Sequence, residues 1–362
     1  MAETYPVFSR FTAKRYWQAV FIVFVILLIA FLPNHSLARE LRDVSGVTIT
    51  VPDKIERIAA AGPPASIFLY SLAPDLMLGW PNRWNPRSIE FLGEPATTMK
   101  IIGSIGGKSG AESNLEYLIA SKPDIIIDLG NHGKTNLSIA ERVRNRTNIP
   151  FVLYDGSIDQ LPHAYREVGE LIGRKDEGEK RAAFIENHLA KIDRIIAAIP
   201  YSKRPGIYYA RGMNGLESGG TKSIHAETIE LGGGRNIIGE VGGNTGILQV
   251  SGDRILALDP DIIVASDNRF ADMAKNDQVW KNLRAVKTGH VLTAPSLPFS
   301  FIDLPPSVNR VIGVMWLAHQ LYPDRYEGDF KADLKEFYAL FYHVDLDDSK
   351  IDAVLGLAKA EQ

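Results

Sequence analysis

The chain has 362 residues, of which 45% are hydrophobic and 23% are charged, and this composition is ordinary for a globular protein. A formal net charge of -3 gives no reason to expect a nucleic acid or an anionic membrane surface as partner. The absence of cysteine excludes disulfides, thiolate metal sites and a lipid anchor on a cysteine.

The first 38 residues predict a secretory signal peptide. Basic residues, the last of them Arg15, precede an apolar run over 17–32, and a small-residue site ends at Ala38. We expect cleavage after Ala38 and a mature protein in the periplasm that is not a lipoprotein. An uncleaved N-terminal anchor is the alternative. No later segment approaches the roughly 20 apolar residues that a membrane-spanning helix needs.

Residues 39–158 predict a first lobe in which strands alternate with helices. The expected strands lie at 47–51, 57–61, 76–79 and 151–154, and the expected helices lie at 65–72 and 138–146. Alternation of this kind is typical of an α/β fold with a mostly parallel sheet flanked by helices.

Residues 159–200 predict a linking helix. Apolar residues recur there at helical spacing among many charges, and Gly173 marks a possible interruption. Beyond the linker, residues 201–362 predict a second α/β lobe that ends in helices. Its expected strands lie at 206–210 and 291–293, and its expected helices at 223–231, 307–321 and 329–342. A single long helical linker is stiff, so we expect the two lobes to move little.

One short pattern occurs twice, once in each predicted lobe. The copies span 114–128 and 251–265. In each copy a helix-capping residue is followed two places later by an acid, and Pro-Asp comes seven residues after that acid. An apolar triplet then closes the copy, which predicts a helix, a turn and a buried strand. Two lobes of like construction behind a signal peptide indicate capture of a solute between them.

Several segments carry a family resemblance. The segment Leu-Glu-Tyr-Leu-Ile-Ala-Ser-Lys-Pro-Asp at 115–124, and Val-Ser-Gly-Asp-Arg-Ile-Leu-Ala-Leu-Asp-Pro-Asp at 250–261, are each similar to a lobe signature of one family. Further similarities lie at 57–59, 66–72 and 229–236. The chain thereby resembles the periplasmic binding proteins of ABC importers for ferric siderophores, haem and cobalamin. The resemblance implies two lobes that clasp a cargo and perform no chemistry.

The resemblance also implies a docking partner. In this family an acid on each lobe tip binds arginines of the membrane permease dimer, which works with an ATPase. The matching positions are Glu116 and Asp253, and the second is usually a glutamate in the family. The alternative is that both acids only stabilise the first turns of their helices.

Candidate ligand-binding residues lie in the loops after the strands, because ligands of open α/β sheets bind beyond the carboxyl ends of the strands. These loops are rich in arginine, which suits anionic groups, and in aromatic residues, which suit a flat or apolar chelate. The expected set is Trp80, Arg83, Trp84, Tyr209, Arg211, His225, Arg269 and Phe299. The alternatives are surface ion pairs for the arginines and packing against the lobe surface for the tryptophans.

His225 and His132 are the candidates for direct metal coordination. They belong to opposite predicted lobes, and neutral imidazole binds iron, nickel or cobalt. A histidine held by hydrogen bonds within the fold is the alternative for each.

The sequence therefore predicts a binding protein that delivers a chelated metal to an ABC importer, with a ferric siderophore as the first choice of cargo. Cobalamin, haem or an oxyanion such as molybdate are the alternative cargoes. No intrinsic cofactor is expected, because the metal chelate is the cargo. A metal-dependent enzyme outside the cytoplasm and a subunit that presents its cargo to a sensor are the alternatives of other classes.

Overall fold

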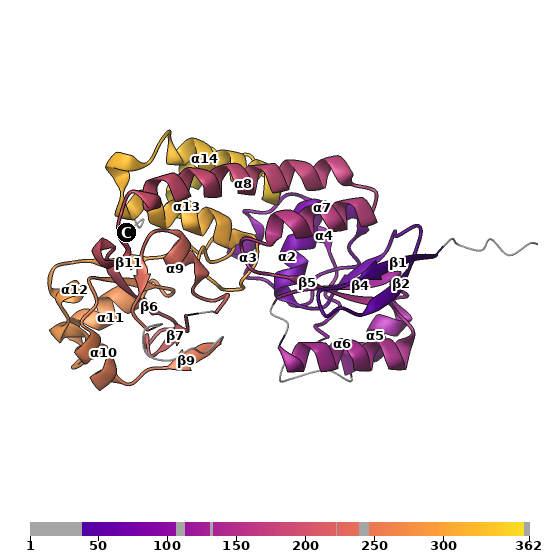
Figure 1. Ribbon diagram of the computed structural model, residues 1–362, viewed down its shortest axis with the longest axis horizontal. Helices are drawn as coiled ribbons and strands as arrows, with labels where there is room; N and C mark the ends of the chain where they lie inside the picture. The colour runs from indigo at the N-terminus through magenta and orange to yellow at the C-terminus, as the bar shows by residue number, and fades with distance from the viewer. Residues whose placement is uncertain (1–37, 106–112, 131–132, 222, 239–245, 358–362) are drawn as a thin grey trace, which may run out of the picture. The chain divides into compact units, whose positions relative to one another are not determined.

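The computed structural model describes residues 38–105, 113–130, 133–221, 223–238 and 246–357 (Figure 1). The chain separates into residues 1–38 and a compact unit of residues 39–362. Among the described residues, no helix combines the length and the apolar character that crossing a membrane requires.

The first lobe is built on a parallel sheet with the strand order β3-β4-β5 (Figure 1). Its strands are β3 (Ile58–Ala60), β4 (Ile125–Gly130) and β5 (Phe151–Asp155). The side chains of β4 alternate between two buried clusters, because successive strand residues point to opposite faces. Helix α2 (Pro63–Leu72) packs on one face, and α5 (Ser113–Ala120) and α6 (Lys134–Thr147) pack on the other.

The second lobe is built on a parallel sheet with the strand order β11-β10-β6-β8. Its strands are β6 (Gly206–Ala210), β8 (Arg235–Asn236), β10 (Ile262–Ala265) and β11 (Val291–Thr293). Two small sheets accompany the main ones, β1 (Ala38–Arg42) with β2 (Thr48–Pro52) and β7 (Glu217–Gly219) with β9 (Ile247–Gln249). The predicted fold class, two lobes with mostly parallel sheets flanked by helices, is confirmed.

The repeated pattern forms the same structure in both lobes. Helix α5 leads to β4 in the first copy, and α10 (Gly252–Leu258) leads to β10 in the second. The Pro-Asp carboxylates have equivalent partners: Asp124 Oδ2 accepts the Arg57 N–H at 2.8 Å, and Asp261 Oδ2 accepts the Gly206 N–H at 2.6 Å. Each aspartate thereby ties the end of its turn to the start of the neighbouring parallel strand.

The predicted linking helix consists of two helices. Helix α7 (Leu161–Leu171) packs against α8 (Lys175–Ala197), and Gly173 lies between them with a φ of 71°, a conformation that glycine adopts readily. A close crossing explains a second glycine, because a Cβ on Gly178 would lie 2.3 Å from the Tyr165 carbonyl oxygen. Helix α8 alone runs on toward the second lobe (Figure 1).

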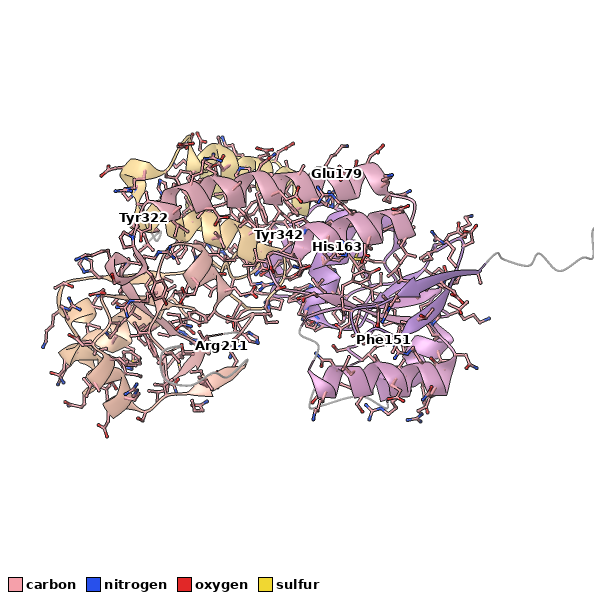
Figure 2. The ribbon with its side chains drawn as sticks, viewed as in Figure 1. Phe151, His163, Glu179, Arg211, Tyr322 and Tyr342 are labelled. Atoms are coloured by element: carbon pink, nitrogen blue, oxygen red, sulfur yellow. The ribbon has the colours of Figure 1, made fainter. Side chains whose placement is uncertain are left out.

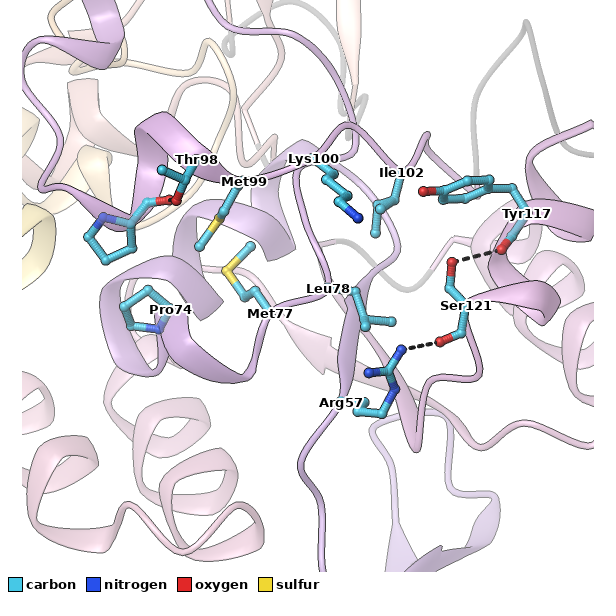
Figure 3. Close-up of a pocket in the computed structure, with 11 residues that line it drawn as sticks. Arg57, Pro74, Met77, Leu78, Thr98, Met99, Lys100, Ile102, Tyr117 and Ser121 are labelled. Carbon is cyan, nitrogen blue, oxygen red and sulfur yellow. Dashed lines mark hydrogen bonds between the residues drawn. The ribbon is translucent and has the colours of Figure 1, made fainter.

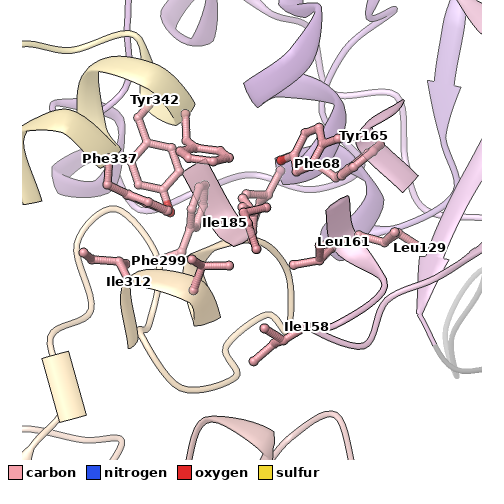
Figure 4. Packing of buried hydrophobic residues seen from close by; sticks show 14 of the residues in the cluster. Phe68, Leu129, Ile158, Leu161, Tyr165, Ile185, Phe299, Ile312, Phe337 and Tyr342 are labelled. Carbon is pink, nitrogen blue, oxygen red and sulfur yellow. The ribbon is translucent and has the colours of Figure 1, made fainter. Parts of the chain in front are cut away.

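The C-terminal helices pack against both lobes, although the sequence assigned them to the second. Tyr342 O accepts the Gly93 N–H at 2.9 Å, and His343 Nε2 lies 3.0 Å from Tyr70 O. Figure 4 shows residues of the shared core, in which Phe68 of α2, Tyr165 of α7 and Phe337 belong to one buried cluster. The lobes are therefore connected by a packed layer as well as by α8.

The remaining helices of the described residues are short or lie near the C-terminus. They are η1 (Pro74–Leu76), α3 (Pro86–Ile89), α4 (Pro95–Thr98), η2 (Tyr201–Lys203), α9 (Glu227–Leu231), α11 (Phe270–Asn276), η4 (Trp280–Asn282), α12 (Arg284–Lys287), α13 (Asn309–Leu321), η5 (Pro323–Arg325), α14 (Phe330–Phe337), η6 (Tyr338–Tyr342) and α15 (Asp348–Leu355). The expected strand at 76–79 is instead the end of η1 and an isolated bridge from Met77 to Ile58.

Candidate ligand-binding site

A pocket of about 320 Å³ lies at the carboxyl ends of β3 and β4. Its walls come from both lobes. The first lobe contributes residues that include Gly62, Pro64, Ser104, Asp128, Gly130 and Asn136, and the second contributes Ile224, His225, Pro305 and Pro306. The position agrees with the rule that open α/β sheets bind ligands beyond the carboxyl ends of their strands.

His225 is the sequence-predicted residue that lines this pocket. It lies in the turn before α9, where its own N–H donates to Ser223 Oγ at 3.2 Å, so the helix expected from residue 223 begins at Glu227. Its Nδ1 lies 2.9 Å from Asp303 Oδ2, and its side chain is 22% exposed. Since a carboxylate only accepts, Nδ1 carries the proton and Nε2 is left for another partner.

Asp303 is fully buried and organises a polar cluster behind His225. The Tyr209 hydroxyl donates to Asp303 Oδ1, and Arg211 Nε donates to Oδ2 at 3.0 Å. Burial and the Asp303 charge hold the Tyr209 pKa well above its ordinary value. Burial opposes the charge on Arg211, but Asp303, Tyr209 and Glu217 together outweigh burial and raise the Arg211 pKa. The cluster thus keeps one negative and one positive charge in place beside the histidine.

Two of the predicted ligand residues serve this cluster instead of lining the pocket. Tyr209 is fully buried, and Arg211 (Figure 2) divides its guanidinium between Asp303 and Glu217, whose Oε2 lies 2.7 Å from Nη1. Both share the Asp303 carboxylate with His225.

Three further predicted residues, Trp80, Trp84 and Phe299, form a packed row of aromatic rings outside the pocket. Trp80 is 1% exposed and donates from Nε1 to Ala96 O at 3.2 Å. Trp84 packs edge-on against both Trp80 and Phe299, with ring centroids 5.8 and 4.8 Å apart. Phe299 is 2% exposed. The structure therefore places these aromatic rings in the core between first-lobe and C-terminal segments.

The other two arginines lie apart from the pocket. Arg83 is exposed in the loop before α3. Arg269 is 70% exposed and forms an ion pair with Asp267 at 2.7 Å. Hydrogen bonds from Arg269 lower the Asp267 pKa. His132 lies outside the described residues.

The two predicted docking acids lie on equivalent helices. Glu116 is exposed in the first turn of α5, and Asp253 is exposed in the first turn of α10. Ser251 caps α10, because its hydroxyl accepts the Arg254 N–H at 3.3 Å.

The sequence reasoning missed Asp303, which holds His225. A signal existed, because Asp303 is the one acid in the apolar stretch 294–306 that follows β11. Asp128 and Asn136 were also missed as pocket residues, although they lie at the end of β4 and at the start of α6. Among the described residues, no group of three or more histidines and acids is arranged to hold a metal ion.

A second pocket, of about 440 Å³, lies on the first lobe beside Arg57, Lys100 and Tyr117 (Figure 3). Arg57 precedes β3, so this pocket adjoins the amino end of that strand. The carboxyl-end rule therefore favours the pocket beside His225 as the ligand site.

The family model described as periplasmic binding protein matches residues 100–297, which is more than half of the chain. The molybdate-binding protein MolA of Haemophilus influenzae is 24% identical over 355 residues, covering 87% of this chain and 94% of MolA. The ferric-citrate-binding protein YfmC of Bacillus subtilis is 26% identical over 197 residues, covering 53% of this chain and 59% of its own length.

Solved structures agree with the sequence comparison. An ABC transporter solute-binding protein of Sulfurospirillum deleyianum has a TM-score of 0.79 at 28% identity, covering 88% of this chain and 99% of that chain. MolA bound to molybdate has a TM-score of 0.71 at 21% identity, covering 85% of this chain and 99% of that chain, which supports the fold.

The chain belongs to the periplasmic binding protein family of ABC importers, as the resemblance predicted. The family and these relatives are binding proteins of transport systems, so the chain is a binding protein and not an enzyme.

Proposed function

We propose that this chain is the cargo-binding component of an ABC importer and carries a compact metal-containing anion in the pocket between its lobes. The observation that carries the proposal is His225, which Asp303 holds through Nδ1 while the ring lines the pocket. The relatives named for molybdate and for ferric citrate support this class of cargo.

The charges around the pocket favour an anion that contains a metal. The first turns of α2 and α6 line it, so the positive ends of both helix dipoles favour negative charge there. Asp128 is the one carboxylate among the described lining residues, and it favours a cation. A metal complex with anionic oxygens offers both charges to the same pocket.

The size of the pocket favours a compact cargo. Its volume of about 320 Å³ lies at the lower end of the roughly 300–1,000 Å³ that ligand pockets occupy. An oxyanion such as molybdate, or a small ferric chelate such as ferric citrate, suits this volume better than haem, cobalamin or a bulky ferric siderophore. The ferric siderophore was the first choice from sequence, and it becomes an alternative outcome of the test.

His225 contacts the cargo through Nε2. Because Nδ1–H donates to Asp303, a charged imidazole presents an N–H to an oxyanion, and a neutral imidazole presents a lone pair to a metal. A carboxylate behind the ring stabilises either arrangement, which is the usual support of a functional histidine.

Native mass spectrometry of protein purified from its own periplasm, followed by calorimetric titration with molybdate, tungstate, ferric citrate and a ferric siderophore, tests the cargo. We expect one of the compact anions to be found bound and to bind again on titration. Binding of the siderophore with no response to the compact anions would overturn the cargo class. No binding of any metal compound would overturn the function.

We propose that Glu116 and Asp253 dock on arginines of the permease. Both are exposed on equivalent helices of the two lobes, which supports their use as a pair. The double variant Glu116→Lys and Asp253→Lys should abolish uptake by cells while the cargo affinity stays unchanged. Glu141→Lys, a charge reversal at an exposed position of α6, is the matched control and should transport normally. Lost cargo affinity in the double variant would contradict the assignment.

We also propose that residues 1–38 direct export and are removed, so that Arg39 becomes the first residue of a periplasmic protein. The described fold supports this boundary, because Arg39 Nη2 already donates to Leu171 O at 2.7 Å at the end of α7. N-terminal sequencing of the periplasmic protein should read Arg-Glu-Leu-Arg, and a chain that still begins before Ala38 would contradict it.

A further inference from the structure

Arg310, the second residue of α13, is fully buried between the two lobes. Its Nε donates to Ser307 O at 3.1 Å, and its Nη1 donates to Ile224 O at 3.0 Å and to Glu227 Oε2 at 2.6 Å. Its Nη2 donates to Gly156 O. Three of these acceptors belong to the second lobe, and Gly156 belongs to the turn after β5 in the first lobe.

Two further hydrogen bonds cross between the lobes at the same place. Glu227 Oε2 also accepts the Ile158 N–H at 3.0 Å, and the Ser307 hydroxyl donates to Pro64 O at 2.7 Å. The start of α13 and the start of α9 are thus joined to two separate segments of the first lobe. Ile158 is itself part of the buried core (Figure 4).

The contacts of Arg310 reach both walls of the pocket. Ile224, which Arg310 holds through its carbonyl, lines the pocket directly before His225. Gly156 donates its N–H to Gly130 O at 3.0 Å, and Gly130 lines the opposite wall. A Cβ on Gly156 would lie 2.8 Å from Gly130 Cα, so the two glycines fit closely. One guanidinium therefore connects the His225 wall to the β4 wall.

Because the Arg310 guanidinium is buried and charged, its contacts restrict the relative position of the two lobes. A guanidinium withdrawn from water is tolerated only where its N–H groups all find acceptors. Those acceptors come from two lobes, so the requirement is met only while the lobes keep one relative position. Nonpolar packing alone does not impose this condition, because it tolerates sliding.

We propose that Arg310 is a positioning residue of the pocket: by joining Ile224 and Glu227 to Gly156 it fixes the lobes at one angle and sets the distance from His225 to the first-lobe wall. The part of the proposal that concerns affinity rests on the proposed function. The part that concerns the lobe angle does not.

Spin labelling measures the lobe angle without any cargo. The chain has no cysteine, so Arg142→Cys on α6 and Lys287→Cys on α12, both at exposed positions, give one label on each lobe of the full mature protein. Pulsed electron–electron double resonance then compares the distance between the two labels in the doubly labelled protein with Arg310 and in the doubly labelled Arg310→Met variant. We expect a broader or shifted distance distribution in Arg310→Met, and molybdate affinity weaker by about tenfold or more.

Arg181 offers a matched control. It is also buried, and it donates to Glu177 and to Leu340 O at 2.9 Å, but neither of these partners lines the pocket. Arg181→Met should lower the melting temperature, as Arg310→Met does, and leave the label distances and the molybdate affinity unchanged.

The outcomes separate the two parts of the proposal. A folded Arg310→Met protein with the distance distribution of the parent would overturn the positioning role. If Arg310→Met does not fold, Arg310→Lys provides the test, because an ammonium keeps the charge but cannot reach all four acceptors, and it should broaden the distribution as well. If the parent does not bind molybdate, molybdate is excluded as the cargo. The distances between the labels still decide whether Arg310 positions the lobes.

Discussion

Asp303 beside the pocket and Asp333 on α14 each bind a tyrosine, a basic side chain and a histidine, yet only the Asp303 cluster belongs to the candidate site. Asp303 binds a tyrosine, an arginine and His225. Asp333 binds a tyrosine, a lysine and a histidine: Tyr326 at 2.7 Å, Lys191 at 3.1 Å and His188 at 3.5 Å. In both clusters the carboxylate is shielded from water, with 0% and 16% of its side chain exposed.

The two clusters differ in what the histidine does with its second nitrogen. His188 Nδ1 lies 2.9 Å from Phe184 O and its Nε2 faces Asp333, so both nitrogens have partners within the packed layer of α8 and α14. His225 gives Nδ1 to Asp303 and its ring lines a pocket. The comparison teaches that a set of residue types does not by itself define a candidate binding site; the position of His225 at a pocket distinguishes the two clusters.

The largest expected effect comes from removing the charge of Asp303. Asp303→Asn leaves the Arg211 guanidinium without its buried partner and releases His225. We expect the free energy of unfolding to fall by about 3–5 kcal/mol, as when one partner of a buried ion pair is removed. We also expect cargo binding to be lost. Chemical denaturation and calorimetry measure the two effects. Normal cargo affinity in a folded Asp303→Asn protein would refute the role that we give this cluster.

Asp333→Asn should affect stability alone. It weakens the hydrogen bonds that join α14 to α8, and we expect a loss of about 1–3 kcal/mol in the free energy of unfolding. Cargo affinity should be unchanged, because the cluster lies outside the pocket. A clear loss of affinity in Asp333→Asn would show that the packed layer controls the pocket and would remove the contrast between the two clusters.

The histidines give the most direct comparison. His225→Ala should weaken binding of the cargo by about tenfold, which corresponds to about 1.4 kcal/mol. It should also reduce stability by about 1 kcal/mol, because Asp303 loses one hydrogen bond. His188→Ala should reduce stability by about 1 kcal/mol through its lost hydrogen bond and leave binding unchanged. Paired titrations and melting curves of the two variants are the measurement. Equal affinities in both variants would exclude His225 as a contact of the cargo.

A further expected effect is a pH dependence of the stability that Asp333 contributes. Burial alone would raise the Asp333 pKa, but hydrogen bonds from His188, Tyr326 and Lys191 outweigh it and lower the pKa from 3.8 to about 2. A lowered pKa means that the stabilisation is present above pH 3.8 and is lost as the pH falls toward 2. The free energy of unfolding, measured as the pH is lowered from 3.8 to 2, should therefore fall more steeply in the parent than in Asp333→Asn. Parallel curves of this free energy against pH for the two proteins would contradict the prediction.

Local sequence patterns predicted the elements where the physical cause is local. The two Pro-Asp segments predicted both helix–turn–strand units, because capping, the restriction before proline and β-branched runs act over a few residues. The same reasoning found the interruption at Gly173, where α7 ends and α8 begins. It extended α9 back to residue 223, because the competing bond from the His225 N–H to the Ser223 hydroxyl is not visible as a pattern.

The candidate site was predicted only in part. The rule for strand ends led to the edge of the sheet where the pocket lies, and His225 was expected separately as a metal ligand near a helix start. The rule does not distinguish a loop residue that faces the pocket from one that turns inward. Trp80 and Phe299 lie in such loops and are buried, because aromatic rings gain more from packing in the core than from contact with water. Arg211 is engaged by Asp303, which lies 92 residues away in the sequence.

The sequence by itself determined the order of strands and helices, the two similar lobes and the family, because each of these follows from periodicity and from short motifs. Tertiary structure alone decided which polar side chains pair with one another and which residues line the pocket. The physical reason is that buried charges such as Asp303 and Arg310 need hydrogen-bond partners, and the fold brings these partners together from distant segments. A buried charge without such partners would carry a large desolvation cost.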